Sequence, residues 1–289
     1  MKASATYLLF DGVLRKDLLL WLYQQEEALE IAPLYLGTRW EELKDIGPVL
    51  VQLQDTAGLL AEYESQINLH SVCSMLTSTQ PIEAVSAHLQ QFIQVTDPQG
   101  SNSLLRFADP LVLQHWLSSY SPQALAWILG PVDVWSVATH QPRWQTNREP
   151  EWQRFSSAHT LRIKAGGNPA HLEEPQTDAL ERAYEQRFQE RLDIWIEETY
   201  PTFRSARLQS WGNWLSDQMH AAREWGITTE RSIATWIDLC IRFGDATFTD
   251  AEGPYNQWLK ASSSASPAHP DNRIQVFDAY LSRHQKGIS

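Results

Sequence analysis

Apolar residues in the first half of the chain come in short runs that alternate with stretches in which they recur every three or four positions. Short apolar runs are typical of buried strands, and the longer period is typical of helices that cover a sheet. Strands are predicted at 6–10, 31–36, 49–53, 70–78, 103–107 and 132–138. Helices are predicted at 15–29, 40–46, 56–68 and 81–93. The pattern indicates an α/β lobe, a mixed sheet with flanking helices.

The second half of the chain shows long helical periods and no such alternation. Helices are predicted at 177–201, 202–226, 228–244, 255–261 and 271–284. The segment between the halves is polar and rich in Pro and Gly, which indicates a hairpin or an irregular connection that ends in a linker near 165–175. The chain is therefore predicted to have an α/β N-terminal lobe at 1–165 and an all-α C-terminal lobe at 172–289.

Asp109 and Pro110 form a strong signal for a helix start. An aspartate side chain caps the free amides of the first turn, and proline takes the first helical position, where its missing N–H costs nothing. Arg106, at the end of a predicted strand, can pair with Asp109 or with another carboxylate nearby. These residues are interpreted as structural, since a catalytic role would need partners supplied by the fold.

The 289-residue chain has a formal net charge of −12 at pH 7, which argues against a nucleic-acid backbone or an anionic membrane surface as partner. A basic or neutral protein partner fits this charge better. No apolar run approaches the roughly 18 residues needed to cross a bilayer, and charged residues within 11–17 interrupt any secretory core. A cytoplasmic protein is therefore expected, with Cys73 and Cys240 as buried thiols.

The sequence lacks the motifs that carry catalysis, a metal or a cofactor. None of its nine histidines stands four residues from another, as two zinc ligands on one helix face would, and neither cysteine has a second ligand nearby. The sequence has no Gly-x-Ser-x-Gly elbow, no phosphate-binding glycine loop and no dinucleotide fingerprint. We therefore expect no enzymatic activity, no catalytic residues, no metal and no cofactor.

Five short motifs follow one another in a characteristic order: LLFDG (8–12), LYLGTRWEEL (34–43), IGPVLVQL (46–53), LLRFADPLVL (104–113) and LGPV (129–132). In this order they resemble the type VI secretion effector adaptors, also called effector chaperones, and the segment 223–244 resembles the usual second lobe of that family. The residues that we interpret as structural in these motifs are Asp11, Gly12, Gly37, Gly47, Pro48, Arg106, Asp109, Pro110, Gly130 and Pro131.

Two positions depart from the pattern of the family. It commonly has an aromatic residue before the aspartate and an arginine after the proline, where this chain has Ala108 and Leu111. Arg106, Asp109 and Pro110 are kept, so the fold assignment is little affected. Any partner contact made from positions 108 and 111 is left open.

The resemblance implies a function without catalysis. Such an adaptor holds a specific toxin effector in the producing cell, keeps it stable and helps attach it to the VgrG spike or its PAAR tip. A second hypothesis is an acidic immunity-type protein that inhibits a cognate toxin, and an enzyme is a third. The chain is larger than the blocking of a toxin requires, which favours the adaptor.

Thirteen tryptophans are the largest departure from ordinary composition, and Trp and Arg are enriched at protein interfaces. At about 100° per residue, Trp211, Trp214 and Trp225 project along one flank of the second long helix. We hypothesise that part of this flank is an exposed effector-binding ledge; the alternative is that a third helix covers it. Arg39 and Trp40 lie on a strand-to-helix loop, where binding residues concentrate. The alternative for Trp40 is that it closes the short helix onto the sheet.

Overall fold

The computed structural model describes residues 4–25, 29–53, 58–65, 67–145, 151–156, 170–261 and 269–285. They divide into two compact units, an N-terminal unit (Met1–Glu185) and a C-terminal unit (Gln186–Ser289). The division falls within helix α7 (Glu174–Thr199). The lobe boundaries at 165 and 172 stay a prediction, because part of the predicted linker lies outside the described residues.

Six strands of the N-terminal unit form one sheet in the order β2-β3-β1-β4-β7-β8. Their bounds are β1 (Ala5–Asp11), β2 (Glu30–Pro33), β3 (Pro48–Leu53), β4 (Cys73–Ser78), β7 (Val134–Ala138) and β8 (Trp152–Ser156). The predicted fold class, a sheet with flanking helices followed by a helical lobe, is confirmed. The strand directions are more uniform than predicted, since each pairing within this sheet is antiparallel.

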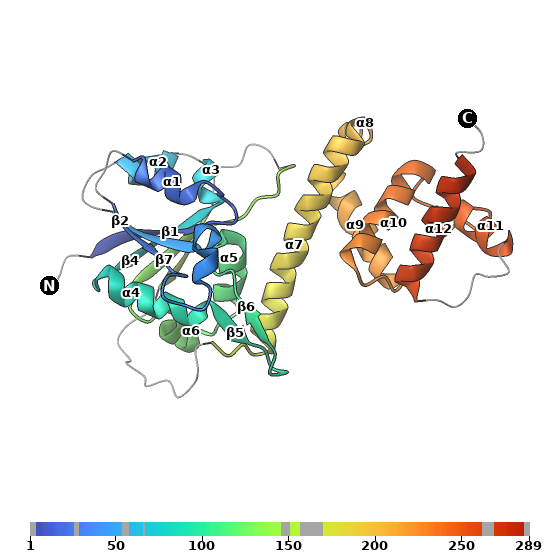
Figure 1. The fold of residues 1–289 in the computed structure, drawn as a ribbon. Helices are drawn as coiled ribbons and strands as arrows, with labels where there is room; N and C mark the ends of the chain where they lie inside the picture. Colours follow the sequence, from blue (N-terminus) through green and yellow to red (C-terminus); the bar gives the residue numbers. More distant parts are fainter. Residues whose placement is uncertain are drawn as a thin grey trace. The chain divides into compact units, whose positions relative to one another are not determined.

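Helices cover both faces of the sheet, as Figure 1 shows. One face packs against α4 (Ile82–Leu89), α5 (Pro110–Ser118) and α6 (Pro122–Leu129); the other packs against α1 (Leu18–Tyr23), α2 (Gly58–Ser65) and α3 (Ile67–His70). In β1, Tyr7 and Leu9 join the first core, whereas Leu8 and Phe10 join the second. Burial on both faces explains why the sequence of this strand is continuously apolar rather than alternating.

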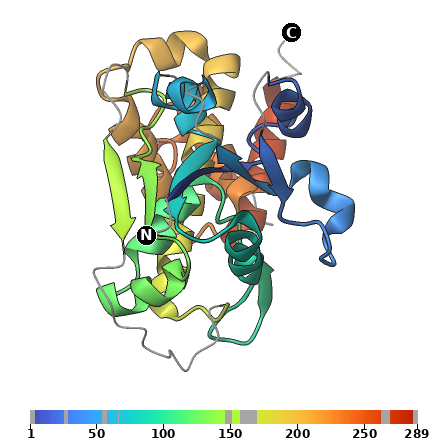
Figure 2. The same cartoon turned by 90° about the vertical axis from the view of Figure 1, so that its left-hand side faces the viewer.

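Some predicted elements differ in length from those observed. The helix predicted at 15–29 spans Leu18–Tyr23. The strand predicted at 103–107 is shorter, β6 (Asn102–Leu104), and pairs with β5 (Gln94–Thr96) in a separate two-stranded sheet. For the segment after β7 the hairpin alternative is confirmed, because β8 pairs antiparallel with β7, and these two strands lie side by side in Figure 2.

The described residues of the C-terminal unit contain helices and connecting turns. The helices that follow α7 are α8 (Pro201–Ser205), α9 (Trp211–Glu224), α10 (Glu230–Phe243), α11 (Pro254–Ala261) and α12 (Pro270–Gln285). The sequence predicts Thr228 or Thr229 as the cap of α10, and the structure assigns this cap to Thr229, whose side chain accepts a hydrogen bond from the amide of Ser232. No helix in the described ranges is both long enough and apolar enough to cross a membrane.

The prediction of one long helix at 202–226 is wrong, because turns separate α8 from α9. The buried carboxylate of Asp193 in α7 explains the break, since it binds residues on both sides of it. Asp193 Oδ1 accepts hydrogen bonds from Arg204 Nε at 2.7 Å and from Trp211 Nε1 at 2.8 Å. These two bonds fix both ends of the break against α7, and Leu208 between them is exposed.

Candidate functional site

Part of the sequence motifs, including Asp11, Gly12, Gly47, Pro48, Arg106 and Asp109, meets at one end of the central sheet. Asp11 ends β1 and faces Pro48, the first residue of β3, across the strand pair. The amide of Gly12 donates a hydrogen bond to the carbonyl of Gly47 at 3.2 Å. A Cβ on Gly12 would lie 2.5 Å from that carbonyl oxygen, and a Cβ on Gly47 would lie 2.6 Å from the Tyr35 ring. Both glycines are therefore required by close packing.

Arg106 joins two buried aspartates at this end of the sheet. Its Nη2 lies 2.9 Å from Asp11 Oδ2 and 3.5 Å from Asp109 Oδ2. The other oxygen of Asp11 accepts hydrogen bonds from the amides of Val13 and Leu14. Asp109 also caps α5, which confirms the predicted helix start at Asp109 and Pro110.

The electrostatics of this cluster are those of a structural ion network. Burial raises the pKa of the Asp11 carboxyl, and the Arg106 guanidinium acts against this rise. The Arg106 side chain is 31% exposed, while those of Asp11 and Asp109 are 5% and 0% exposed. Because both carboxylates already accept backbone amides and the guanidinium, the cluster holds three chain segments together.

The remaining structural glycines and proline lie elsewhere in the N-terminal unit. Gly37 and Gly130 have positive φ angles of 71° and 53°, a region that favours glycine. A Cβ on Gly130 would also lie 2.4 Å from the His88 ring, so the end of α6 needs glycine on two counts. The carbonyl of Pro131 accepts a hydrogen bond from Ser78 Oγ at 2.6 Å, which ties this turn to β4.

Arg39 and Trp40 lie on the loop before the 3-10 helix η1 (Glu41–Ile46). The Arg39 guanidinium is exposed and lies 4.7 Å from the centre of the Trp40 ring. The Trp40 ring is half-buried and packs against the larger core of the N-terminal unit. This packing favours the alternative in which Trp40 closes the short helix onto the sheet. A partner-binding role for the pair stays a prediction.

The three tryptophans of the predicted ledge do not share one exposed surface. Trp211 is fully buried, so any exposed part of the flank does not include it. Trp214 is half-buried, stacks on Trp211 with ring centres 5.4 Å apart, and donates its Nε1 hydrogen to Asp245 at 3.0 Å. Trp225 contacts three aromatic rings of the C-terminal core: Trp236, Phe248 and Tyr255. The alternative that neighbouring elements cover the flank describes most of this surface.

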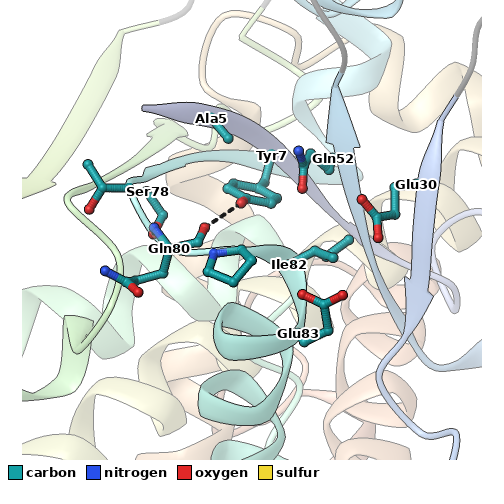
Figure 3. Close-up of a pocket in the computed structure, with 10 residues that line it drawn as sticks. Ala5, Tyr7, Glu30, Gln52, Ser78, Gln80, Ile82 and Glu83 are labelled. Atoms are coloured by element: carbon teal, nitrogen blue, oxygen red, sulfur yellow. Dashed lines mark hydrogen bonds between the residues drawn. The ribbon is translucent and has the colours of Figure 1, made fainter. Parts of the chain in front are cut away.

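A pocket of about 470 Å³ opens at the other end of β1 (Figure 3). Tyr7 of β1 forms one wall, and its hydroxyl donates a hydrogen bond to the carbonyl of Gln80 at 2.7 Å. Glu30 of β2 and Glu83 of α4 carry the carboxylates of the lining. This pocket has no signal in the sequence, because no motif links residues 30 and 83 and only the fold brings them together.

A metal site is not evident in the described part of the chain, where no group of three or more His, Cys, Asp or Glu side chains could hold an ion. Cys73 and Cys240 are both buried and free. Burial raises the pKa of the Cys240 thiol to about 12 and raises that of Cys73 well above its usual value. Neither thiol is therefore an activated nucleophile.

Comparison with known proteins identifies the first of the two units. Residues 6–126 match the family described as "Domain of unknown function (DUF4123)". The accessory protein VasW of Vibrio cholerae serotype O1 is 33% identical over 103 residues, which are 36% of this chain and 34% of that protein. The match thus spans about a third of the length of this curated relative, and no solved structure matches the chain. Residues 6–126 therefore resemble the DUF4123 family over less than half of the chain, and both matches support the resemblance of the chain to the type VI secretion effector adaptors.

Proposed function

We propose that this protein is a cytoplasmic type VI secretion adaptor that binds a specific toxin effector and helps load it onto the VgrG spike or its PAAR tip. The observation that carries the proposal is the DUF4123 match over residues 6–126. The likeness to the accessory protein VasW supports the same role. The effector and the spike component are both proteins, in keeping with a net charge that disfavours nucleic acid and anionic membranes.

The chemistry of the described residues supports binding rather than catalysis. A general acid or base needs a free position within hydrogen-bond reach of a substrate. The buried carboxylates of Asp11 and Asp109 instead accept backbone amides and the Arg106 guanidinium. The two thiols are buried and their pKa values are raised. We therefore propose that the protein is not an enzyme.

Co-expression with a candidate type VI toxin effector from the same organism tests the proposal. We expect the full-length protein to raise the steady-state level of that effector, and to co-purify with it and with VgrG or PAAR. An effector from a different type VI cluster serves as the matched control and should gain nothing. Recovery of no secretion component would overturn the proposal. Restored growth of cells that express the isolated toxin domain, without any gain in effector level, would indicate the immunity-type inhibitor instead.

A further inference from the structure

The pocket in Figure 3 is lined by both apolar and acidic residues. Tyr7 and Ile82, both buried, supply apolar surface, and Ala5 adds to it. The volume of about 470 Å³ lies within the range of roughly 300–1,000 Å³ that is typical of ligand sites. None of the ten residues that line the pocket is Lys, Arg or His.

The two carboxylates of the pocket come from different elements, and no cation of the described ranges pairs with either of them. Glu30 lies on β2, the edge strand of the sheet, and Glu83 lies in the first turn of α4. Both are exposed. Burial raises the pKa of the Tyr7 hydroxyl, and the charges of Glu30 and Glu83 raise it further, so both carboxylates act on the same small space.

This lining is complementary to a cation carried on an aliphatic stem. An arginine side chain has an apolar stem of three methylene groups and a planar head with five N–H donors. The acceptors in the pocket are spread over two carboxylates and the Gln52 side-chain amide, which suits a forked guanidinium better than the compact ammonium of lysine. We propose that the pocket binds an arginine side chain presented by a partner protein.

This inference rests on the proposed function for the identity of the partner, which is the effector or the spike protein. The pocket then determines which partner segments the adaptor can bind. The partner segment that docks at the β2 edge of the sheet presents an arginine, and a partner without one is discriminated against, because Glu30 and Glu83 remain uncompensated.

The chemical preference is measured on the ¹⁵N-labelled full-length protein with three small probes. n-Butylguanidine represents the arginine side chain, n-butylamine is the ammonium counterpart, and n-butylurea is a neutral molecule of nearly the same shape. We expect saturable shifts of the amide NMR signals of residues 30, 52, 80, 82 and 83 with n-butylguanidine, weaker binding of n-butylamine and none of n-butylurea. Equal binding of the urea or of the amine would overturn the assignment, and so would shifts that do not saturate.

A charge-matched pair of variants links the binding to the two glutamates. Glu30→Gln with Glu83→Gln removes two charges from the pocket, and Glu42→Gln with Asp45→Asn removes two from exposed positions of η1. All four positions are exposed, so both variants should fold, which the thermal midpoint checks. We expect the pocket variant to lose affinity for n-butylguanidine by about tenfold and the η1 variant to keep it. Equal losses in both would show that only the net charge matters.

The same two variants separate this inference from the proposed function in cells. If the wild-type protein and the η1 variant recover the effector or spike and the pocket variant does not, the pocket proposal is supported. If all three recover it equally, the pocket proposal fails while the adaptor function stands. If the wild-type protein recovers no secretion component, the adaptor function fails, and the three-probe measurement still decides the preference for guanidinium.

Discussion

Arg106 pairs with the two buried aspartates Asp11 and Asp109. We expect Arg106→Ala to lower the free energy of unfolding by about 3 kcal/mol, because a buried carboxylate left without its partner is costly. Urea unfolding at pH 7 measures the loss. Arg39→Ala removes an exposed arginine of the same unit and is the matched control, with an expected change below about 0.5 kcal/mol. Equal stability of the two variants would contradict the structural role of Arg106.

The pH dependence of the Arg106→Ala variant follows from the raised pKa of Asp11. Burial raises this pKa in the folded state, so protonation of Asp11 favours the fold at low pH, and that contribution is lost as the pH rises through the folded pKa. Removing Arg106 takes away an attraction for the carboxylate and raises the pKa further. The stability deficit of the variant should therefore shrink as the pH falls from 7 toward the usual aspartate pKa of about 3.9. A deficit independent of pH would point to lost packing instead.

Trp214 of the predicted ledge is half-buried and stacks on the fully buried Trp211. We expect Trp214→Ala to lower the free energy of unfolding by about 2 kcal/mol, less than for a fully buried tryptophan, because the ring is half-buried. Trp214→Phe keeps a ring to stack on Trp211 and loses the hydrogen bond to Asp245, so it should cost about 1 kcal/mol. Thermal and urea unfolding compare the two. A stable Trp214→Ala protein that no longer retains its effector would restore the ledge hypothesis.

At the scale of elements, Asp271 connects the beginnings of α10 and α12. Its carboxylate accepts hydrogen bonds from the amides and hydroxyls of Thr228 and Thr229. Burial alone would raise the pKa of Asp271, but these bonds and that of Ser232 together hold it well below its usual range. We expect Asp271→Ala to cost about 2 kcal/mol, and Asp217→Ala, at an exposed position of α9, to cost less than about 0.5 kcal/mol.

The contribution of Asp271 also depends on pH, with a sign opposite to that of Asp11. A lowered pKa in the folded state means that the stabilisation is complete above the usual aspartate pKa of about 3.9 and is lost as the pH falls below it. The difference in stability between the wild-type and Asp271→Ala proteins should therefore be constant above about pH 4 and shrink progressively as the pH falls from there toward the lowered folded pKa. A constant difference in stability at every pH would show that the carboxylate charge plays no part.

The sequence predicts well those elements whose signal is local, either a pattern of buried residues or a capping residue at the end of the element. β1 is continuously apolar because both of its faces are covered, and α10 begins where Thr229 provides its own cap. The break between α8 and α9 escapes prediction because its cause, Asp193, lies on another helix. Likewise, β5 has only three residues, too few to show a period.

The candidate sites follow the same rule. Local signals predict most of the cluster around Arg106, because Asp109 and Pro110 are adjacent in the sequence. Only Asp11 comes from a distant element, β1. The pocket has no local signal, because Glu30 and Glu83 share a cavity only through the pairing of β2 with β3 and the packing of α4. The tryptophan flank gives a local signal that does not predict exposure. Its helical phase is real, but burial is decided by aromatic residues from other elements, such as Trp236 and Tyr255.

At the scale of the whole molecule, each of the two compact units has its own core. We therefore expect calorimetry to resolve two unfolding transitions. Arg106→Ala should lower mainly the transition of the N-terminal unit, and Asp271→Ala mainly that of the C-terminal unit. One transition that both substitutions lower equally would show that the units unfold as a single cooperative body.

The net charge of −12 shapes association with the proposed partner. Electrostatic attraction acts mainly on the rate of encounter, and salt screens it. For the purified effector, raising NaCl from about 50 to 500 mM should slow association by about tenfold and change dissociation much less. Surface plasmon resonance measures both rates. Association that does not respond to salt would exclude a basic partner surface.

The two cysteines allow the local opening of each unit to be measured separately. Cys73 lies in the N-terminal unit and Cys240 in the C-terminal unit, and both are fully buried. Alkylating reagents attack the thiolate, which burial suppresses at both positions. Each thiol therefore reacts only when the core around it opens to solvent. Mass spectrometry measures the rate at which each cysteine is alkylated. This rate reports local opening of one unit at a time, and it needs no engineered probe because both cysteines are native.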